Sequence, residues 1–565
     1  MINLYITATK YIQLLLIVLY TYCNFRFLSI PDQDDANPLC DWQLRIILLV
    51  HFLMNLTVFL KTGEVSTLIF YGLQLIFFVL YTFFSVRIYR NINRLLLNNT
   101  VFFLAYGLIT IERLDMGKAI KQFVIVIGAA VMTLAVPYVI DKVWDLVKWR
   151  YHFAAFGIIM QGIVFVIGAT SYGAKMSISI GGFTFQASEL VKITFVLATA
   201  GMLSQAESFR DIVITSLVAG AHMLILVMCK DLGSALIFFL AYLVILFIAT
   251  NKVVYLILGN LGMCLAAVFS YFSFSHVRTR VFAWLDPWAD IDNKGYQITQ
   301  SLFAIGTGGF AGLGLYQGLP NKIPIVEKDF IISAISEEMG AVTAICITLV
   351  CLGCFMQMMV MGTYMEDSFY KYVSVGLAIE YIVQVFLTIG GAIKFIPSTG
   401  VTLPFVSYGG SSLVSAFIVF AIIQALYIIQ GNEDEADERA AYDNVSGVAA
   451  YDKQGYPDTG YDEDNSGDAV YDEDEYEDMD YDASYEDSYD DPDYEDSGYD
   501  NQNYDDQDYD DPDYDERDYD DRDYDETGYY KDDYSDYDEP GNRRGKEASG
   551  GGYKNERIRA EDLGL

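Results

Sequence analysis

The chain has 565 residues, and its formal charge of −38 belongs almost entirely to one end. Residues 431–565 contain 51 acidic and 11 basic side chains, whereas residues 1–430 carry a net charge of +2 and are dominated by Leu, Ile, Val, Phe and Ala. The acidic balance therefore says nothing about partners of the apolar part, and no nucleic-acid partner is expected. The apolar part excludes a soluble domain, because soluble domains do not carry one bilayer-length apolar segment after another.

Thirteen apolar segments are predicted to cross the membrane as helices. They lie near residues 11–28, 43–60, 65–86, 99–111, 122–140, 151–171, 188–204, 211–228, 232–249, 252–273, 331–358, 370–391 and 412–430. The first is predicted to be a retained helix rather than a cleaved signal, since Arg26 stands where a small-residue cleavage site would be needed. The sequence therefore predicts an all-α, polytopic integral membrane protein.

The orientation of the chain follows from its positive charges. Lys and Arg gather in two short loops, at Arg87, Arg90 and Arg94 and at Lys142, Lys148 and Arg150. Such an excess marks the cytoplasmic side of a membrane. Counting spans from these loops predicts that the loops around 172–187, 274–330 and 393–411 lie outside and that the acidic tail lies in the cytoplasm.

The tail is a degenerate repeat in which tyrosines recur every five residues from Tyr489 through Tyr529, within Asp-rich pentads. A segment with high net charge and few aliphatic residues cannot bury enough apolar surface to fold, so disorder is expected. One interpretation is a solvated acidic tail with no single function. The other is a regulated docking tail for cytoplasmic partners, with tyrosine phosphorylation as its switch.

Two polar clusters fall at the start of apolar segments. The stretch GAKMSISIGGFTFQASELVK, residues 173–192, is predicted to be a loop that leads into a span carrying Glu189 and Lys192. Residues three apart face the same side of a helix, so these charges can pair, and charges inside a span usually mark a functional interior. A purely structural ion pair is the alternative. Helix capping explains Asp231, in KDLGSAL at 230–236.

The third cluster is the segment from Arg278 to Gly340, which is too polar to span the membrane and too long for a passive connection. Asp329 lies where this segment re-enters the membrane, next to Lys328. A carboxylate there, partly desolvated and near cations, is suited to act as a general base. A structural acid at a helix start is the alternative interpretation.

The fourth cluster, PSTGVTLPFVSYGGSS at 397–412, combines prolines, glycines and hydroxyls between two spans. Irregular backbone at membrane depth is tolerated only where it lines a cavity or is covered by protein. By itself this cluster fits a transporter-like substrate site as well as an enzyme.

In order and spacing, the four clusters resemble the shape, elongation, division and sporulation family (RodA/FtsW/SpoVE-like). LDPWAD followed by GYQITQSLFAIGTGG, and then TGVTLPFVSYGGSS, are highly specific to it. FQASELVK and KDLGSAL resemble the family's F-Q-P-S-E-x-x-K and P-D-L-G-T, with Ala187 and Lys230 in place of proline. The match divides the chain into three: extra N-terminal transmembrane helices at 1–95, a ten-helix glycosyltransferase core at 96–430, and a disordered Tyr/Asp-rich tail at 431–565.

Members of this family are peptidoglycan glycosyltransferases that polymerise lipid II, a disaccharide-peptide on undecaprenyl diphosphate, at the outer face of the bacterial cytoplasmic membrane. The resemblance implies that Asp329 is the essential catalytic aspartate. The family's P-E-x-H-T-D-F reads Pro324-Ile-Val-Glu-Lys-Asp329-Phe here, and Thr388 stands where Q-x-x-x-N-x-G usually has asparagine. The substrate-binding residues implied by the resemblance are Arg280, Lys192, Glu189, Gln297, Gln300, Ser407 and Ser411.

The resemblance thus predicts lipid II polymerisation in cell elongation, division or sporulation, with Asp329 as the base and Arg280 or Lys192 stabilising the diphosphate. No metal-ligand constellation is evident, because Cys351-x-x-Cys354 has no second pair and is explained by packing. A divalent cation, Mg²⁺ or Mn²⁺, is the one cofactor left open. The implied partner is a class B penicillin-binding protein. A lipid II flippase and a non-catalytic division scaffold are the alternative functions.

Overall fold

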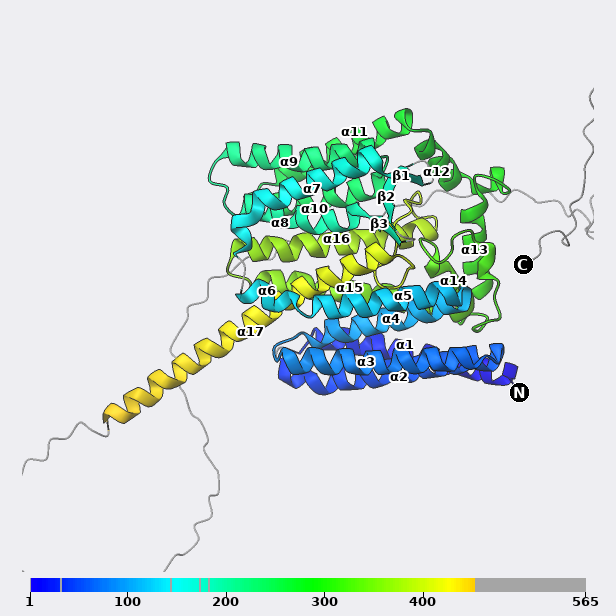
Figure 1. Cartoon of the computed structure of the whole chain (residues 1–565), viewed down its shortest axis with the longest axis horizontal. Coiled ribbons are helices and arrows are strands. Elements are labelled where there is room, and N and C mark those ends of the chain that lie inside the picture. The colour runs from blue at the N-terminus through cyan, green and yellow to red at the C-terminus, as the bar shows by residue number, and fades with distance from the viewer. Residues whose placement is uncertain (1, 31–32, 143–144, 172–173, 181–182, 453–565) are drawn as a thin grey trace, which may run out of the picture. The chain divides into compact units, whose positions relative to one another are not determined.

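The computed structural model describes residues 2–30, 33–142, 145–171, 174–180 and 183–452, and most of them are helical (Figure 1). The elements in chain order are α1 (Ile2–Phe27), α2 (Gln33–Thr62), α3 (Val65–Ile88), α4 (Arg94–Leu114), α5 (Met116–Thr133), α6 (Val136–Lys142), η1 (Leu146–Trp149), α7 (Arg150–Ile167), β1 (Ala169–Ser171), β2 (Ala174–Ile180), β3 (Phe183–Gln186), α8 (Ala187–Leu203), α9 (Phe209–Met228), α10 (Leu232–Thr250), α11 (Val253–Ser273), α12 (Ser275–Leu285), η2 (Pro287–Asp290), α13 (Tyr296–Gly308), η3 (Pro320–Lys322), α14 (Ile331–Met339), α15 (Ala341–Tyr364), α16 (Ser368–Ala392) and α17 (Gly410–Asp452). The predicted all-α class is confirmed, with one small sheet as an addition to it.

Within the described ranges, twelve helical segments are long and apolar enough to cross a membrane. They coincide with twelve of the predicted spans. The remaining one, predicted at 188–204, forms α8, which has only 17 residues. The segment predicted to be short, at 99–111, forms the 21-residue helix α4, which is capped by Asn93 and buried from Leu95 to Glu112. The chain is a multi-pass membrane protein with α4 inside the bundle.

Two predicted segments have a different structure. The loop predicted at 173–187 contributes β2 and β3 to an antiparallel sheet of order β1-β2-β3. Serine alternates with apolar residues in this stretch, and that period of two is typical of a strand.

The span predicted at 331–358 is broken into α14 and α15 at Gly340, whose φ of 95° few other residues adopt. A short helix therefore follows Asp329 directly.

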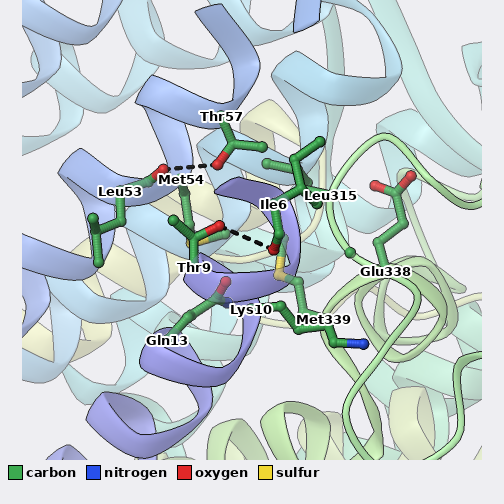
Figure 2. Close-up of a pocket in the computed structure, with 11 residues that line it drawn as sticks. Ile6, Thr9, Lys10, Gln13, Leu53, Met54, Thr57, Leu315, Glu338 and Met339 are labelled. Atoms are coloured by element: carbon green, nitrogen blue, oxygen red, sulfur yellow. Dashed lines mark hydrogen bonds between the residues drawn. The ribbon is translucent and has the colours of Figure 1, made fainter. Parts of the chain in front are cut away.

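The three N-terminal helices pack against the rest of the bundle through α4, α5 and α15. Tyr20 of α1 donates a 2.9 Å hydrogen bond to Asn99 of α4. Lys10 of α1 donates to the carbonyl of Gly312, in the loop after α13, over 2.9 Å. A small cavity lies beside this contact, lined by residues of α1, α2 and α14 (Figure 2). Because polar contacts between helices hold them together inside a membrane, these bonds fix the extra helices to the core.

The last helix, α17, is longer than predicted. It runs to Asp452, so residues 431–452, predicted as the beginning of the disordered tail, continue the helix. Figure 1 shows α17 leaving the bundle at the end opposite β1–β3 and α13. The rest of the predicted tail, residues 453–565, lies outside the described residues.

Candidate functional site

Asp329 lies in the turn that precedes α14 and is partly buried. Desolvation raises the pKa of its carboxyl group to about 6, and the nearby cationic groups of Arg280 and Lys328 offset this only in part. Such a carboxyl group is still largely ionised at neutral pH and is a stronger base than an ordinary aspartate. Asp329 therefore has the protonation properties of a general base.

Arg280 and Asp329 meet at Gly400, in the loop between α16 and α17. Gly400 has a φ of 78°, which favours glycine. A β-carbon added to Gly400 would lie 3.4 Å from Nη2 of Arg280 and 4.0 Å from Oδ2 of Asp329. The Nη1 group of Arg280 donates to the carbonyl of Ser398 over 2.9 Å, which holds the guanidinium in this place. Two predicted site residues are thus brought to one point of the backbone.

The predicted pair of Glu189 and Lys192 is present on α8. The Nζ group of Lys192 lies 2.7 Å from Oε2 of Glu189 and donates over 2.7 Å to Oε1 of Gln384, on α16. Gln384 in turn donates to the carbonyl of Thr402 over 2.9 Å. Hydrogen bonds through Gln384 therefore connect the ion pair both to α16 and to the loop that contains Gly400.

Asp231 caps α10, as predicted, because its Oδ1 accepts a 3.1 Å hydrogen bond from the backbone N–H of Ser234. Its other oxygen accepts from the hydroxyls of Ser188 and Ser234. Asp231 is buried, and desolvation raises its pKa. The capping interpretation is confirmed, but it is incomplete because Asp231 also faces the cavity described next.

One cavity brings these groups together. It is lined by Gln186, Ser188, Glu189, Lys192, Asp231, Ser234, Ile237, Phe238, Gln384, Thr399, Gly400, Val401 and Thr402. Gly400 thus borders both the cavity and the pair formed by Arg280 and Asp329. Residues from all four polar clusters of the sequence meet at this place, although these clusters are far apart along the chain.

The other four predicted substrate-binding residues do not line this cavity. Ser407 donates to the carbonyl of Lys328, and Ser411 accepts a 3.0 Å hydrogen bond from the backbone N–H of Gln186. Gln297 donates to the carbonyl of Pro324 over 2.9 Å, and Gln300 is partly buried on the same helix, α13. Ser407, Ser411 and Gln297 thus each bond to the backbone of another segment of the site, and the role of all four residues in binding substrate stays a prediction.

Two of the positions at which this chain departs from the family's motifs, Glu327 and Thr388, make contacts within the site. Glu327 forms an ion pair with Lys118 of α5 at 2.6 Å, and its carbonyl accepts a 2.7 Å hydrogen bond from the N–H of Tyr408. Thr388 donates to the carbonyl of Val401 over 3.0 Å. Both substituted residues therefore support the loops around Asp329 and Gly400.

Sequence reasoning missed the role of Arg113. Its guanidinium lies 3.0 Å from the Glu338 carboxylate, which also accepts from the N–H of Gly318 over 3.2 Å. Glu337 accepts from the N–H of Leu319 over 2.8 Å. These acids of α14 thus hold the loop after α13, at Gly318 and Leu319, and do not line the cavity bordered by Gly400. Glu380 is a second residue that the sequence analysis missed. It is an acid inside the predicted span at 370–391, and a charged residue inside a span usually marks a functional interior, as was argued for Glu189.

Comparison with known proteins concerns the part of the chain that contains this site. A sequence model of FtsW, RodA and SpoVE, described as "Cell cycle protein", matches residues 100–430. The chain is 32% identical over 353 residues to the peptidoglycan glycosyltransferase RodA of Mycobacterium tuberculosis strain H37Rv, covering 56% of this chain and 74% of the relative. It is 35% identical over 265 residues to a probable peptidoglycan glycosyltransferase FtsW of Geobacter sp. strain M18, covering 45% and 71%.

A solved structure, described as "Structural coordination of polymerization and crosslinking by a peptidoglycan synthase complex", is similar with a TM-score of 0.51. The alignment covers 60% of this chain and 98% of that one at 22% sequence identity. At this level of identity the similarity concerns the fold alone. The N-terminal helices α1–α3 lie outside the region that the family model matches.

Proposed function

The chain belongs to the FtsW, RodA and SpoVE family of cell cycle proteins, and we propose that the cavity beside Asp329 is its active site. Like its relatives, it is a peptidoglycan glycosyltransferase, which polymerises lipid II into glycan strands. The proposal rests on one observation: the side chains of Asp329 and Arg280 both lie next to Gly400, which lines the same cavity as Lys192. A base and two cations at one place suit the transfer of a sugar from a diphosphate.

In the proposed reaction, Asp329 takes the proton of the sugar 4-hydroxyl of the acceptor. That oxygen forms a bond to the anomeric carbon of the growing strand. The bond from this carbon to the diphosphate oxygen breaks, and undecaprenyl diphosphate leaves with the electron pair. Because negative charge grows on the diphosphate, Arg280 and Lys192 stabilise the transition state. The carboxylic acid on Asp329 then releases its proton to solvent.

A resident Mg²⁺ or Mn²⁺ does not fit the residues around Asp329. The guanidinium of Arg280 is its neighbour, and Glu189 is engaged by Lys192. A hard cation prefers several oxygen ligands, and within the described ranges no group of three or more His, Cys, Asp or Glu could hold a metal. The proposed mechanism therefore uses side chains of this chain, and a Mg²⁺ or Mn²⁺ held mainly by the diphosphate of the substrate stays a prediction.

The rate of polymerisation is expected to rise with pH through about pH 6 and to level off above it. The base works in its ionised form, and the Asp329 pKa of about 6 sets the midpoint. Initial rates of the purified protein on lipid II, measured from about pH 5 to about pH 8, test this. A rate that falls as pH rises through this range would assign the step to a group that must be protonated.

We further propose that the active-site loops lie on the outer side of the cytoplasmic membrane and the C-terminal end of α17 in the cytoplasm. The loops rich in Lys and Arg at residues 87–94 and 142–150 support this orientation. The proposed partner is a class B penicillin-binding protein, because new glycan strands must be crosslinked. The similar peptidoglycan synthase complex coordinates those two activities.

The test of the function is polymerisation of purified lipid II by the purified protein, alone and with its cognate class B penicillin-binding protein. Glycan strands are expected in both reactions, with a higher rate when the partner is present. A protein that moves lipid II across vesicle membranes but makes no strands under either condition would be a flippase. A protein with neither activity would be a scaffold.

Truncation after Asp452 should leave polymerisation in vitro nearly unchanged. The truncation keeps α17 whole, and this helix leaves the bundle at the end opposite β1–β3 (Figure 1). We expect effects only in cells, on the localisation or abundance of the protein, through contacts of a polyanion that weaken as salt rises. Comparing the initial rates of the two purified proteins tests this. A large loss of rate by a truncated protein that is still monodisperse would show that the tail supports the catalytic body.

A further inference from the structure

Glu380 is a buried acid on α16 that the proposed mechanism does not use. Its side chain is 1% exposed, and neither carboxyl oxygen has a hydrogen-bond partner among the described residues. An ionised carboxylate inside a membrane protein is costly unless a cation or several donors compensate it. Glu380 therefore needs either a proton or a share of a nearby cation.

The one nearby cation is already engaged. Among the described residues, the charges that act on Glu380 are Lys192 and Glu189, both from α8. Lys192 lies 2.7 Å from Glu189 and 2.7 Å from Gln384, which stands one helical turn beyond Glu380 on α16. On the side of α15, the thiols of Cys351 and Cys354 lie against the next residue, Tyr381. One ammonium group cannot neutralise two carboxylates.

The cavity adds a second reason for a neutral Glu380. Asp231 also lines this cavity beside Glu189, and Asp329 stands at its border. A further negative charge acting on Lys192 would oppose the binding of a diphosphate and would compete for the ammonium group. A neutral acid at this position leaves Lys192 at the cavity wall.

We propose that Glu380 is an intramembrane proton-binding site and a positioning residue for Lys192. While Glu380 holds its proton, Lys192 stays between Glu189 and Gln384, facing the cavity and the diphosphate that enters it. When Glu380 loses the proton, its carboxylate draws Lys192 toward the bundle interior, and the cavity loses a cation. The identity of the anion rests on the proposed function, whereas the protonation of Glu380 does not.

Two measurements that need no turnover test this proposal. In infrared spectra of the full-length protein, the C=O stretch of a protonated carboxyl group should be present in the wild type and reduced in Glu380→Gln. In binding measurements with fluorescent lipid II, the wild-type affinity should fall several-fold as the solution becomes alkaline. The affinity of Glu380→Gln should stay at the high value across the same range, because glutamine mimics the neutral acid.

Glu112→Gln is the matched control. Glu112, on α4, is likewise a buried acid, but its neighbour is Gln74 of α3, whereas the cation that acts on Glu380 is Lys192 of the cavity wall. Its substitution should also remove a carboxylic acid signal while the affinity keeps the wild-type dependence on pH. Glu380→Met, which is uncharged and of similar length, should bind lipid II as Glu380→Gln does.

Three outcomes would overturn the proposal. The first is an infrared spectrum that Glu380→Gln leaves unchanged. The second is an affinity of Glu380→Gln that follows pH as the wild-type affinity does. The third is a melting temperature of Glu380→Gln that falls as far as that of Lys192→Ala, which would mean that Glu380 is ionised and paired. A failure of polymerase activity alone would contradict the proposed function and leave the protonation result standing.

Discussion

Asp329→Asn is expected to abolish polymerisation of lipid II while the protein still folds and inserts into the membrane. General-base catalysis contributes roughly 100-fold to 10,000-fold, and asparagine has the size of aspartate but cannot take the proton. The measurement is the initial rate of glycan-strand formation by the purified variant. Retention of most of the wild-type rate would remove Asp329 from the mechanism.

The stability of this variant provides an internal check. The folded protein raises the Asp329 pKa from 3.8 to about 6. A group whose pKa is higher in the folded state loses stabilisation as pH rises between these two values. At neutral pH the ionised carboxylate is therefore unfavourable for folding, and Asp329→Asn should melt at the wild-type temperature or above it. Asp292→Asn, at an exposed acid of the same long segment, should change neither rate nor melting temperature.

Lys192→Ala is expected to have the largest effect on stability. Lys192 is 6% exposed and lies 2.7 Å from Glu189. Removing one partner of a buried ion pair leaves an uncompensated charge, which costs about 3–5 kcal/mol. The melting temperature in detergent should fall markedly. The double variant Glu189→Ala with Lys192→Ala should be less destabilised than the sum of the two single variants.

Lys118→Ala is the control for this experiment. Its ion pair with Glu327 is of similar length, at 2.6 Å, and Glu327 is 12% exposed, but the Lys118 side chain is 39% exposed. Solvent reaches the ammonium group and screens this pair in part, so the loss should be smaller than that caused by Lys192→Ala. Equal losses from Lys118→Ala and Lys192→Ala, or additive losses from the two members of the buried pair, would show that burial does not set the strength of the Glu189–Lys192 contact.

The spans could be predicted from the sequence because a bilayer demands about 20 apolar residues per helix, and that demand depends only on local composition. The break at Gly340 could not, since one glycine in an apolar run is compatible with an unbroken helix. It is set by the φ of 95° that joins α14 to α15. The sheet was missed because the glycines at 172–182 suggested a loop and masked the strand alternation in AKMSISI.

The site was predictable where spacing or motif carries the information. The pairing of Glu189 with Lys192 follows from their separation by three residues, and Asp329 and Arg280 follow from the resemblance. The contact of Arg113 with Glu338 joins residues 225 apart in sequence, and that of Lys118 with Glu327 joins residues 209 apart. Such pairs depend on how the helices pack, which no local pattern encodes.

The length of α17 gives the protein a built-in spacer. The helix continues from the predicted span's end at Gln430 to Asp452, and at 1.5 Å per residue this extension is about 33 Å long. Electrostatic interactions in physiological salt decay over about 8 Å, and the cytoplasmic leaflet is anionic. On the proposed orientation, and if the extension stands away from the membrane, the repeat sequence after Asp452 begins several screening lengths from the lipid headgroups, unlike the acids at 433–438. Lipid charge would then not repel it, and a basic partner could bind it without touching the bilayer.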